Sequence, residues 1–536
     1  MPGPEKRSIG IAMRAAKGIF LGACMAAATG AISAADAVSP FEKAGPVKPG
    51  CKIDELVFAR LEKLDIQPAN PCSDAVFLRR AFLDVIGTLP TIKETRDFLD
   101  DADADKRSKL VDRLLARPEF ADYWALKWAD LLRVKAEFPI NLWPNAVQAY
   151  HRWIRAAVKQ NMPYDQFVRE LLTASGSNFR NPQVNFYRAL QSKEPKAVAG
   201  AVALTFMGER TDKWAPERLD GMASFFSKIG YKSTLEWKEE IVFFDASKQV
   251  PGVRAAPVFP DGKTAQIGAE ADPREVFAQW LTSPENPWFA RNIANRVWAW
   301  LFGRGIIHEP DDIREDNPPS NPELLAWLAG EVVSGKYDLR RLFRIILNSQ
   351  TYQLSSIRRS DRPEAEANFA FYPMRRLDAE VLIDALCQIT GTTEEYTSAI
   401  PEPFTFIPDD QRSIALADGS VTSPFLEMFG RSPRDTGLES ERNNRPTAAQ
   451  GLHLLNSSHI RTKIEQGEKL RQLIWSSASP EEAVTRAYLA ILSRPPTRQE
   501  MGGVRKYFES GKVSRQDAYV DLAWALVNGA EFLHRH

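Results

Sequence analysis

Four polar side chains in one short segment have the clearest capacity for chemistry. Arg291, Asn292, Asn295 and Arg296 follow Pro287 among several tryptophans, and helical spacing places the last three on one face. Guanidinium and amide groups that are buried need partners. Two interpretations follow: a polar pocket for an oligosaccharide or an anionic group, or a structural network that joins this helix to a loop.

A histidine and several acids come next, after a glycine-containing turn. His308, Asp311, Asp312 and Arg314 lie close together in the sequence, and the acids complement the charge of Arg296. A histidine beside carboxylates can ligate a metal or transfer protons. The alternative is a solvated, salt-bridged loop packed between helices. We place the principal functional surface on the helix and this turn together.

A third polar segment lies much later in the chain. Glu439, Glu441 and Arg442 belong to this segment, residues 439–444, and we expect it to close over the same surface. Paired carboxylates suit glycoside hydrolysis when they are held several ångströms apart across a sugar. Acidic pairs in loops are usually solvated, and spacing in the sequence does not give the separation in space. Whether the chain is an enzyme therefore stays undecided.

No metal site is predicted. The chain has no H-E-x-x-H motif. Asp101, Asp103 and Asp105 have the spacing of a calcium loop, but Lys106 stands where that loop needs its turn glycine. The sequence also lacks a G-x-S-x-G motif, a P-loop and a dinucleotide fingerprint. No local motif thus identifies a nucleophilic or nucleotide-dependent reaction.

The cysteines allow one structural prediction. Cys51 and Cys72 flank the first helical pattern after the leader, and in an oxidising compartment they can form a disulfide. We predict this disulfide, with two unpaired thiols as the alternative. Cys387 lies inside an apolar helical pattern and is expected to be an inert core thiol.

The first residues differ from the rest of the chain. A basic start precedes the uncharged stretch 18–31, and small residues with the pattern Ala35-Asp36-Ala37 follow. This order is typical of a secretory signal peptide, assigned to residues 1–37, and predicts export to the periplasm or beyond. The alternatives are a short amphipathic anchor and a lipoprotein site at Cys24. No later run is apolar enough to span a bilayer, so no transmembrane segment is expected in the mature chain.

The elements that must position these groups are mostly helical. Apolar periodicity predicts a helix from Ile53, Ser73 is a candidate cap for the next one, and Thr91 to Glu94 form a capping box. Strand-like runs are few, and residues 240–245 are the best of them. The predicted fold class is therefore mainly α, with few short strands.

Composition divides the chain after its leader. Residues 246–270 are rich in Pro, Gly, Ala and Asp, which indicates an irregular linker between a helical domain at 38–245 and a second at 271–536. Residues 391–446 form another long irregular region, of the kind that is often functional. Lysine plus arginine equals aspartate plus glutamate, 69 each, and this balance argues against a nucleic-acid partner.

The order of several segments carries a family resemblance. IDELVFARLEKLDIQP and LRRAFLDVIGTLPT lie in the first half, and YDLRRLFRIILNSQTYQLSS and RPTAAQGLHLLNSSHI in the second. This order, over about residues 50 to 536, resembles a planctomycete-type family of secreted proteins of unknown function. Its members combine a DUF-fifteen-forty-nine domain, also called a planctomycete cytochrome-c domain, with a DUF-fifteen-fifty-three domain.

One departure from that family concerns haem. Many members carry a C-x-x-C-H motif late in the first domain, which implies covalently attached haem. The corresponding stretch here, Leu204 to Phe226, contains neither cysteine nor histidine. We therefore expect no covalent haem and no other cofactor.

Three functions remain as hypotheses. The first is an exported, haem-less binding or assembly component of a secreted degradative or redox system, with a glycan or a secreted protein as partner. The second is a hydrolase or lyase acting on extracellular polysaccharide, a substrate class that only the family resemblance implies. The third is a subunit that partners a cytochrome.

Overall fold

The computed structural model describes residues 39–248, 257–268 and 270–536. The predicted signal peptide and Cys24 lie outside the described residues. Helices account for 53% of the described residues and strands for 5%, which confirms the mainly helical prediction. In the part of the chain that is described, no helix combines the length and the apolar character needed to cross a membrane.

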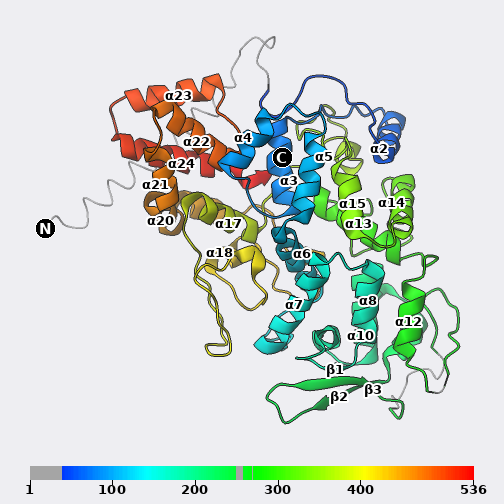
Figure 1. The fold of residues 1–536 in the computed structure, drawn as a ribbon. Helices are drawn as coiled ribbons and strands as arrows, with labels where there is room; N and C mark the ends of the chain where they lie inside the picture. Colours follow the sequence, from blue (N-terminus) through cyan, green and yellow to red (C-terminus); the bar gives the residue numbers. More distant parts are fainter. Residues whose placement is uncertain (1–38, 249–256, 269) are drawn as a thin grey trace.

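The first half of the chain contains helices and one small antiparallel sheet with the strand order β1-β3-β2 (Figure 1). The α-helices are α2 (Lys52–Lys63), α3 (Asp74–Val85), α4 (Ile92–Asp100), α5 (Lys106–Ala116), α6 (Pro118–Leu131), α7 (Pro144–Lys159), α8 (Tyr164–Thr173), α9 (Asn185–Arg188), α10 (Pro195–Val202) and α11 (Pro216–Ala223). Short 3-10 or π turns are η1 (Pro182–Val184), η2 (Ala203–Met207), η3 (Thr211–Lys213) and η4 (Ser224–Phe226), and the strands are β1 (Gly176–Ser177), β2 (Ile229–Ser233) and β3 (Glu240–Phe244).

The second half combines helices and irregular segments with one two-stranded pairing, β4 (Arg375–Arg376) with β5 (His534–Arg535). The α-helices are α12 (Pro273–Leu281), α13 (Phe289–Phe302), α14 (Pro322–Ser334), α15 (Leu339–Leu347), α16 (Glu364–Ala367), α17 (Ala379–Thr390), α18 (Pro424–Met428), α19 (Ala448–Asn456), α20 (Ser458–Gln466), α21 (Glu468–Trp475), α22 (Pro480–Leu492), α23 (Arg498–Glu509), α24 (Arg515–Val527) and α25 (Ala530–Leu533). Two 3-10 turns are η5 (Ser413–Ala415) and η6 (Glu439–Glu441).

Local capping explains where several helices begin. The Ser73 side chain accepts a hydrogen bond from the backbone N–H of Val76, 3.3 Å away. Thr91 and Glu94 form the predicted capping box at the start of α4. Both contacts satisfy backbone donors that a helix leaves free at its first turn. These two sequence predictions are confirmed.

The two halves share one hydrophobic core. A continuous cluster of buried residues extends from Ile53 on α2 to Phe532 on α25. Within it, Trp124 on α6 packs against Trp300 on α13 and Phe343 on α15, with ring centroids 5.1 and 4.4 Å apart. Because aromatic rings of this size bury much apolar area, such contacts bind the halves together.

A buried carboxylate adds polar contacts across the same boundary. Asp84 on α3, with 1% of its side chain exposed, accepts hydrogen bonds from the hydroxyls of Tyr352 and Tyr372, each at 2.8 Å. It also pairs with Arg375 and Arg535, at 2.8 and 3.0 Å. All four partners belong to the second half, so α3 depends on that half for the neutralisation of its charge.

Candidate functional site

Three of the sequence-predicted site residues meet in a buried network. Arg296 on α13 donates to Asp311, 2.8 Å away, and another nitrogen of its guanidinium lies 3.6 Å from Glu439. The backbone N–H of Glu439 donates to the other oxygen of Asp311, at 2.6 Å. Burial raises the pKa of the Glu439 carboxyl. The loop that begins at Glu439 therefore contacts both the helix and the acidic turn.

Asn295 fixes the same turn to the helix. Its side-chain amide donates to the carbonyl of Ile307 at 3.0 Å and accepts from the Ile307 N–H at 2.9 Å. Both hydrogen-bonding ends of this amide are thus used within the protein. Of the two interpretations of this region, the geometry favours the network that joins helix to loop.

The other predicted site residues lie apart from this network. Arg314 pairs with Asp312, 2.9 Å away, near the surface. Glu441 accepts from the backbone N–H of Thr436 at 2.8 Å. His308 lies at the surface, and desolvation of its imidazole, with nearby Arg304, lowers the pKa of this group.

Arg291 and Arg442 belong to two further environments. Arg291 lines a groove of about 650 Å³ between the start of α13 and α14. Arg442 pairs with Asp130 on α6 and Glu380 on α17, at 2.7 and 2.6 Å. The predicted residues therefore do not form one common site around a cavity.

The predicted disulfide between Cys51 and Cys72 is not formed in the structure, where both are free thiols. The Cys51 thiol lies 3.3 Å from the Asp54 carboxylate, at the start of α2. The Cys72 thiol is buried, with Arg107 at 3.9 Å. Each sulfur is thus directed to a different polar neighbour.

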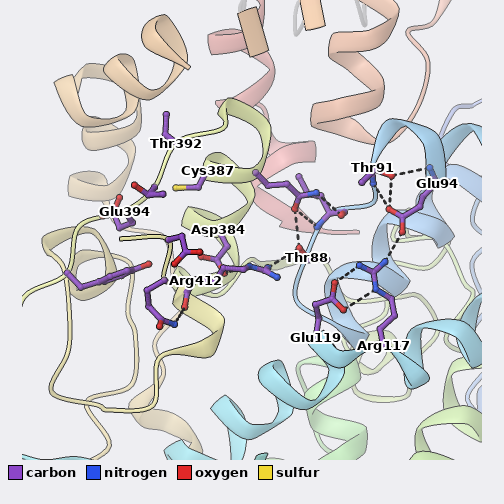
Figure 2. A pocket seen from close by; sticks show the side chains of 16 residues that line it. Thr88, Thr91, Glu94, Arg117, Glu119, Asp384, Cys387, Thr392, Glu394 and Arg412 are labelled. Carbon is purple, nitrogen blue, oxygen red and sulfur yellow. Dashed lines mark hydrogen bonds and ion pairs between the residues drawn. The ribbon is translucent and has the colours of Figure 1, made fainter. Parts of the chain in front are cut away.

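A cavity of about 360 Å³ lies elsewhere, between segments from the two halves, and Figure 2 shows its lining side chains. One wall comes from the loop after α3, the start of α4 and the start of α6. The other comes from α17 and the loop of residues 392–412. The lining residues are Thr88, Leu89, Thr91, Glu94, Arg117, Glu119, Asp384, Cys387, Gln388, Thr392, Thr393, Glu394, Tyr396, Asp410, Gln411 and Arg412.

Gln388 and Arg412 connect the two walls. The Gln388 amide accepts from the Thr88 hydroxyl at 3.1 Å and donates to the carbonyl of Leu89 at 2.9 Å. The Arg412 guanidinium donates to the same Thr88 hydroxyl at 3.0 Å and lies 3.4 Å from Asp384 (Figure 2). Because these contacts cross the cavity, the positions of both walls are coupled.

Asp384 is a deeply buried acid of the lining. Its carboxylate accepts from the backbone N–H groups of Ser413 and Ile414, at 2.8 and 3.2 Å. Burial raises the pKa of Asp384 in spite of these donors and of Arg412.

Three further acids of the lining are paired with cations. Glu94 accepts from Arg117 at 2.7 Å, and the same guanidinium lies 3.2 Å from Glu119. On the opposite wall, Glu394 lies 2.8 Å from the His459 imidazole and 3.1 Å from the Lys463 ammonium. Each of these carboxylates is therefore held in one orientation by a charged partner.

Cys387 borders the cavity rather than lying wholly in the core. Its sulfur is 3.6 Å from the Lys463 ammonium, yet burial raises the pKa of the thiol. A thiol of this kind is a poor nucleophile at neutral pH. The raised pKa agrees with the expectation that this thiol is inert.

The cavity offers hydroxyl, amide, carboxylate and guanidinium groups in fixed positions. Such groups suit the recognition of a ligand rich in hydroxyls, because each ligand hydroxyl both donates and accepts. Among the residues that the structure describes, no group of three or more His, Cys, Asp or Glu is arranged to hold a metal ion.

The cavity could not be predicted from the sequence. Its walls come from residues 88–119 and 384–412, and nothing in their spacing shows that they meet. Two sequence features that were predicted do contribute to its lining: the capping box at Thr91 and the irregular region that starts at Gly391. Neither one indicates a binding role by itself.

The segment that corresponds to the family's haem motif holds a different set of contacts. Glu209, just after η2, accepts from the indole N–H groups of Trp214, at 2.8 Å, and of Trp288, and it pairs with Arg218 at 3.1 Å. These side chains supply no thiol for a thioether bond and no imidazole for iron. The residues present here do not fit a covalent haem.

The chain matches two families in succession. Residues 52–216 match a family described as protein of unknown function (DUF1549), and residues 273–508 match a second described as protein of unknown function (DUF1553). No curated protein and no solved structure matches the chain. The cavity of Figure 2 takes its walls from both matched regions.

Proposed function

Because the chain carries a DUF1549 domain followed by a DUF1553 domain, both of unknown function, we propose a role from its geometry: an exported, haem-less binding component. Its ligand site is the cavity between the two domains, and its ligand is a hydroxyl-rich molecule such as a glycan. The single observation that supports this proposal is the cavity of about 360 Å³ itself, with polar groups from both domains.

The fixed orientation of the lining groups supports binding. Gln388, Arg117 and Glu394 are each held by neighbouring protein groups before any ligand arrives. Side chains that are already ordered lose little conformational entropy when a ligand binds. A site of this construction favours affinity without any need for a chemical step.

The experiment is a binding titration with the full chain. Soluble xylan and mixed-linkage β-glucan oligosaccharides are titrated into wild type and into a double variant, Asp410→Ala with Gln411→Ala, which removes two polar groups from the lining. Asp409→Ala is the matched control, because Asp409 is an exposed neighbour that does not line the cavity. We expect at least tenfold weaker binding for the double variant and wild-type binding for the control. Equal affinity of all three proteins, or no binding by wild type, would contradict the proposal.

A second candidate, a hydrolase or lyase acting on extracellular polysaccharide, is favoured by one observation. The raised pKa of Asp384 increases the fraction of this carboxyl that keeps its proton, as a general acid requires. Release of new reducing ends from xylan or β-glucan, abolished in Asp384→Asn, would support this candidate over simple binding. Absence of such release by wild type would remove it for these substrates.

Export rests on the leader sequence. The basic, apolar and small-residue order of residues 1–37 supports cleavage near Ala34 to Ala37. N-terminal sequencing of the protein from its native host tests this part of the proposal. An intact Met1 would contradict it.

A further inference from the structure

Three aromatic side chains from separate segments meet at the surface near the loop that lines the cavity. Trp143, at the start of α7, lies 6.3 Å from Trp237 in the β2–β3 hairpin and 5.3 Å from Phe404, measured between ring centroids. Trp237 is 66% exposed and Phe404 is 51% exposed. We call Trp143, Trp237 and Phe404 the aromatic platform.

The platform is held in place at a cost to the backbone. Trp143 has a φ of +73°, and Lys238, whose ammonium lies 5.7 Å from the Trp143 ring centroid and 5.4 Å from that of Trp237, has a φ of +61°. Residues with a side chain rarely adopt such angles, and they are held there only by their surroundings. The rings of Trp237 and Phe404 nevertheless stay largely exposed.

Hydrogen bonds make the hairpin that carries Trp237 rigid. The Glu239 carboxylate accepts from the hydroxyl of Thr234 at 2.7 Å and from that of Ser177 at 2.5 Å. The Asn178 amide donates to the Lys238 carbonyl at 3.2 Å. The platform is thus prepared before any partner binds, as expected of a binding surface rather than of a mobile tip.

One loop links the platform to the cavity. Thr392 and Arg412, at the two ends of this loop, line the cavity, and Phe404 lies between them in the sequence and contacts Trp143. The backbone N–H of Ala399 in the same loop donates to Glu137, which precedes Trp143 in the chain, at 3.2 Å. The loop therefore has polar lining groups at its ends and an aromatic contact between them.

We propose that the aromatic platform is a second subsite of the same binding component, which stacks on the sugar rings of a polysaccharide that also reaches the cavity. The inference rests on the proposed function. A saccharide chain combines hydroxyl edges, which the cavity can hydrogen-bond, with apolar ring faces, which indole and phenyl rings can cover. An apolar protein segment would match the platform but not the polar cavity on the same loop.

The test is affinity electrophoresis of the full chain in native gels that contain soluble xylan, mixed-linkage β-glucan or alginate. Trp237→Ala and Phe404→Ala remove exposed rings, and Trp475→Ala is the matched control because Trp475 on α21 is 64% exposed and lies outside the platform. We expect the two platform variants to bind a retarding polysaccharide at least tenfold more weakly, with unchanged melting temperature, and the control to migrate as wild type. Binding of short oligosaccharides in the cavity should change much less.

Three outcomes would overturn the inference, and they distinguish its failure from that of the proposed function. If wild type is retarded and both platform variants are retarded equally, the platform is not a subsite, although the cavity can still bind glycan. If no saccharide of any length binds wild type, the proposed function fails together with the platform. A shift in oligomeric state of Trp237→Ala, with retardation unchanged, would assign the platform to self-association and also overturn the inference.

Discussion

The side chains of Arg296 and Asp311 form an ion pair at 2.8 Å in which the two side chains are only 1% and 2% exposed. Asp311 also accepts from the backbone N–H of Glu439. One buried pair thus anchors both the acidic turn after α13 and the loop that begins at residue 439. This explains why residues with the composition of an active site serve here to hold loops in place.

The first prediction tests that structural role. Arg296→Ala should lower the free energy of unfolding by about 3–5 kcal/mol, because it leaves the Asp311 charge buried without its partner. Arg314→Ala is the control: Arg314 pairs with Asp312 and Asp316 near the surface, where such pairs contribute about 0–1 kcal/mol. Urea denaturation of both variants checks the difference. An Arg296→Ala protein as stable as wild type that has lost glycan binding would show instead that the network is a binding site.

A second prediction concerns two glycines with opposite surroundings. Gly208 has a φ of +69°, and a Cβ there would lie 2.7 Å from the Asn292 side-chain oxygen and 2.8 Å from the Ile313 side chain. Gly208→Ala should therefore destabilise the protein by more than about 1 kcal/mol.

Gly330, within α14, provides the contrast. A Cβ at Gly330 would have no neighbour within 4 Å. Gly330→Ala should stabilise the protein by about 0.5–1 kcal/mol, because alanine has the higher helix propensity. Thermal unfolding of both variants checks the two signs. A stable Gly208→Ala protein would mean that the contact between η2 and the acidic turn is looser than the structure has it.

The third prediction concerns the reactivity of Cys51. Burial, with the nearby Asp54 carboxylate, raises the pKa of this thiol to about 11. Only the thiolate reacts with iodoacetamide, so the labelling rate should rise about tenfold per pH unit from pH 8 to 10 rather than level off near 9. Peptide mass spectrometry after timed labelling measures it. If Cys51 stays unlabelled at every pH until a reductant is added, the disulfide with Cys72 is present in solution and this prediction is wrong.

Some of this structure could be predicted because its causes are local. The capping box at Thr91 and Glu94 depends on residues three apart, and the strand at Glu240–Phe244 on a short β-branched and aromatic run. The ion pair of Arg296 with Asp311 could be predicted for the same reason, because a single turn separates the helix that carries Arg296 from the loop that carries Asp311. In these cases the residues that interact are also near in sequence.

The rest depends on which helices meet, and the sequence pattern does not contain that information. Arg442 was expected beside Arg296, but its partners are Asp130 on α6 and Glu380 on α17. The cavity likewise joins Thr88 to Arg412. Apolar periodicity shows that a helix has a buried face, but it does not show which other helix covers that face.

The last prediction concerns acid sensitivity and His151 on α7. Its side chain is 5% exposed, and burial, reinforced by Arg434, lowers the pKa of the imidazole to about 3. An unfolded chain binds this proton with the ordinary pKa of about 6.5, so protonation favours unfolding. The contribution of His151 to stability is therefore complete above pH 6.5 and is lost progressively as the pH falls from about 6.5 towards 3.

From pH 7 to 4.5 this one group should cost about 2–3 kcal/mol of the free energy of unfolding. His151→Gln and His151→Phe cannot take up the proton, so both should show a smaller loss over that interval, whatever their stability at pH 7. Urea denaturation of wild type and both variants at pH 7 and 4.5 measures the two losses, and carboxylates elsewhere contribute equally to all three proteins. Equal losses in wild type and variants would mean that His151 is protonated as readily in the folded protein as in the unfolded chain.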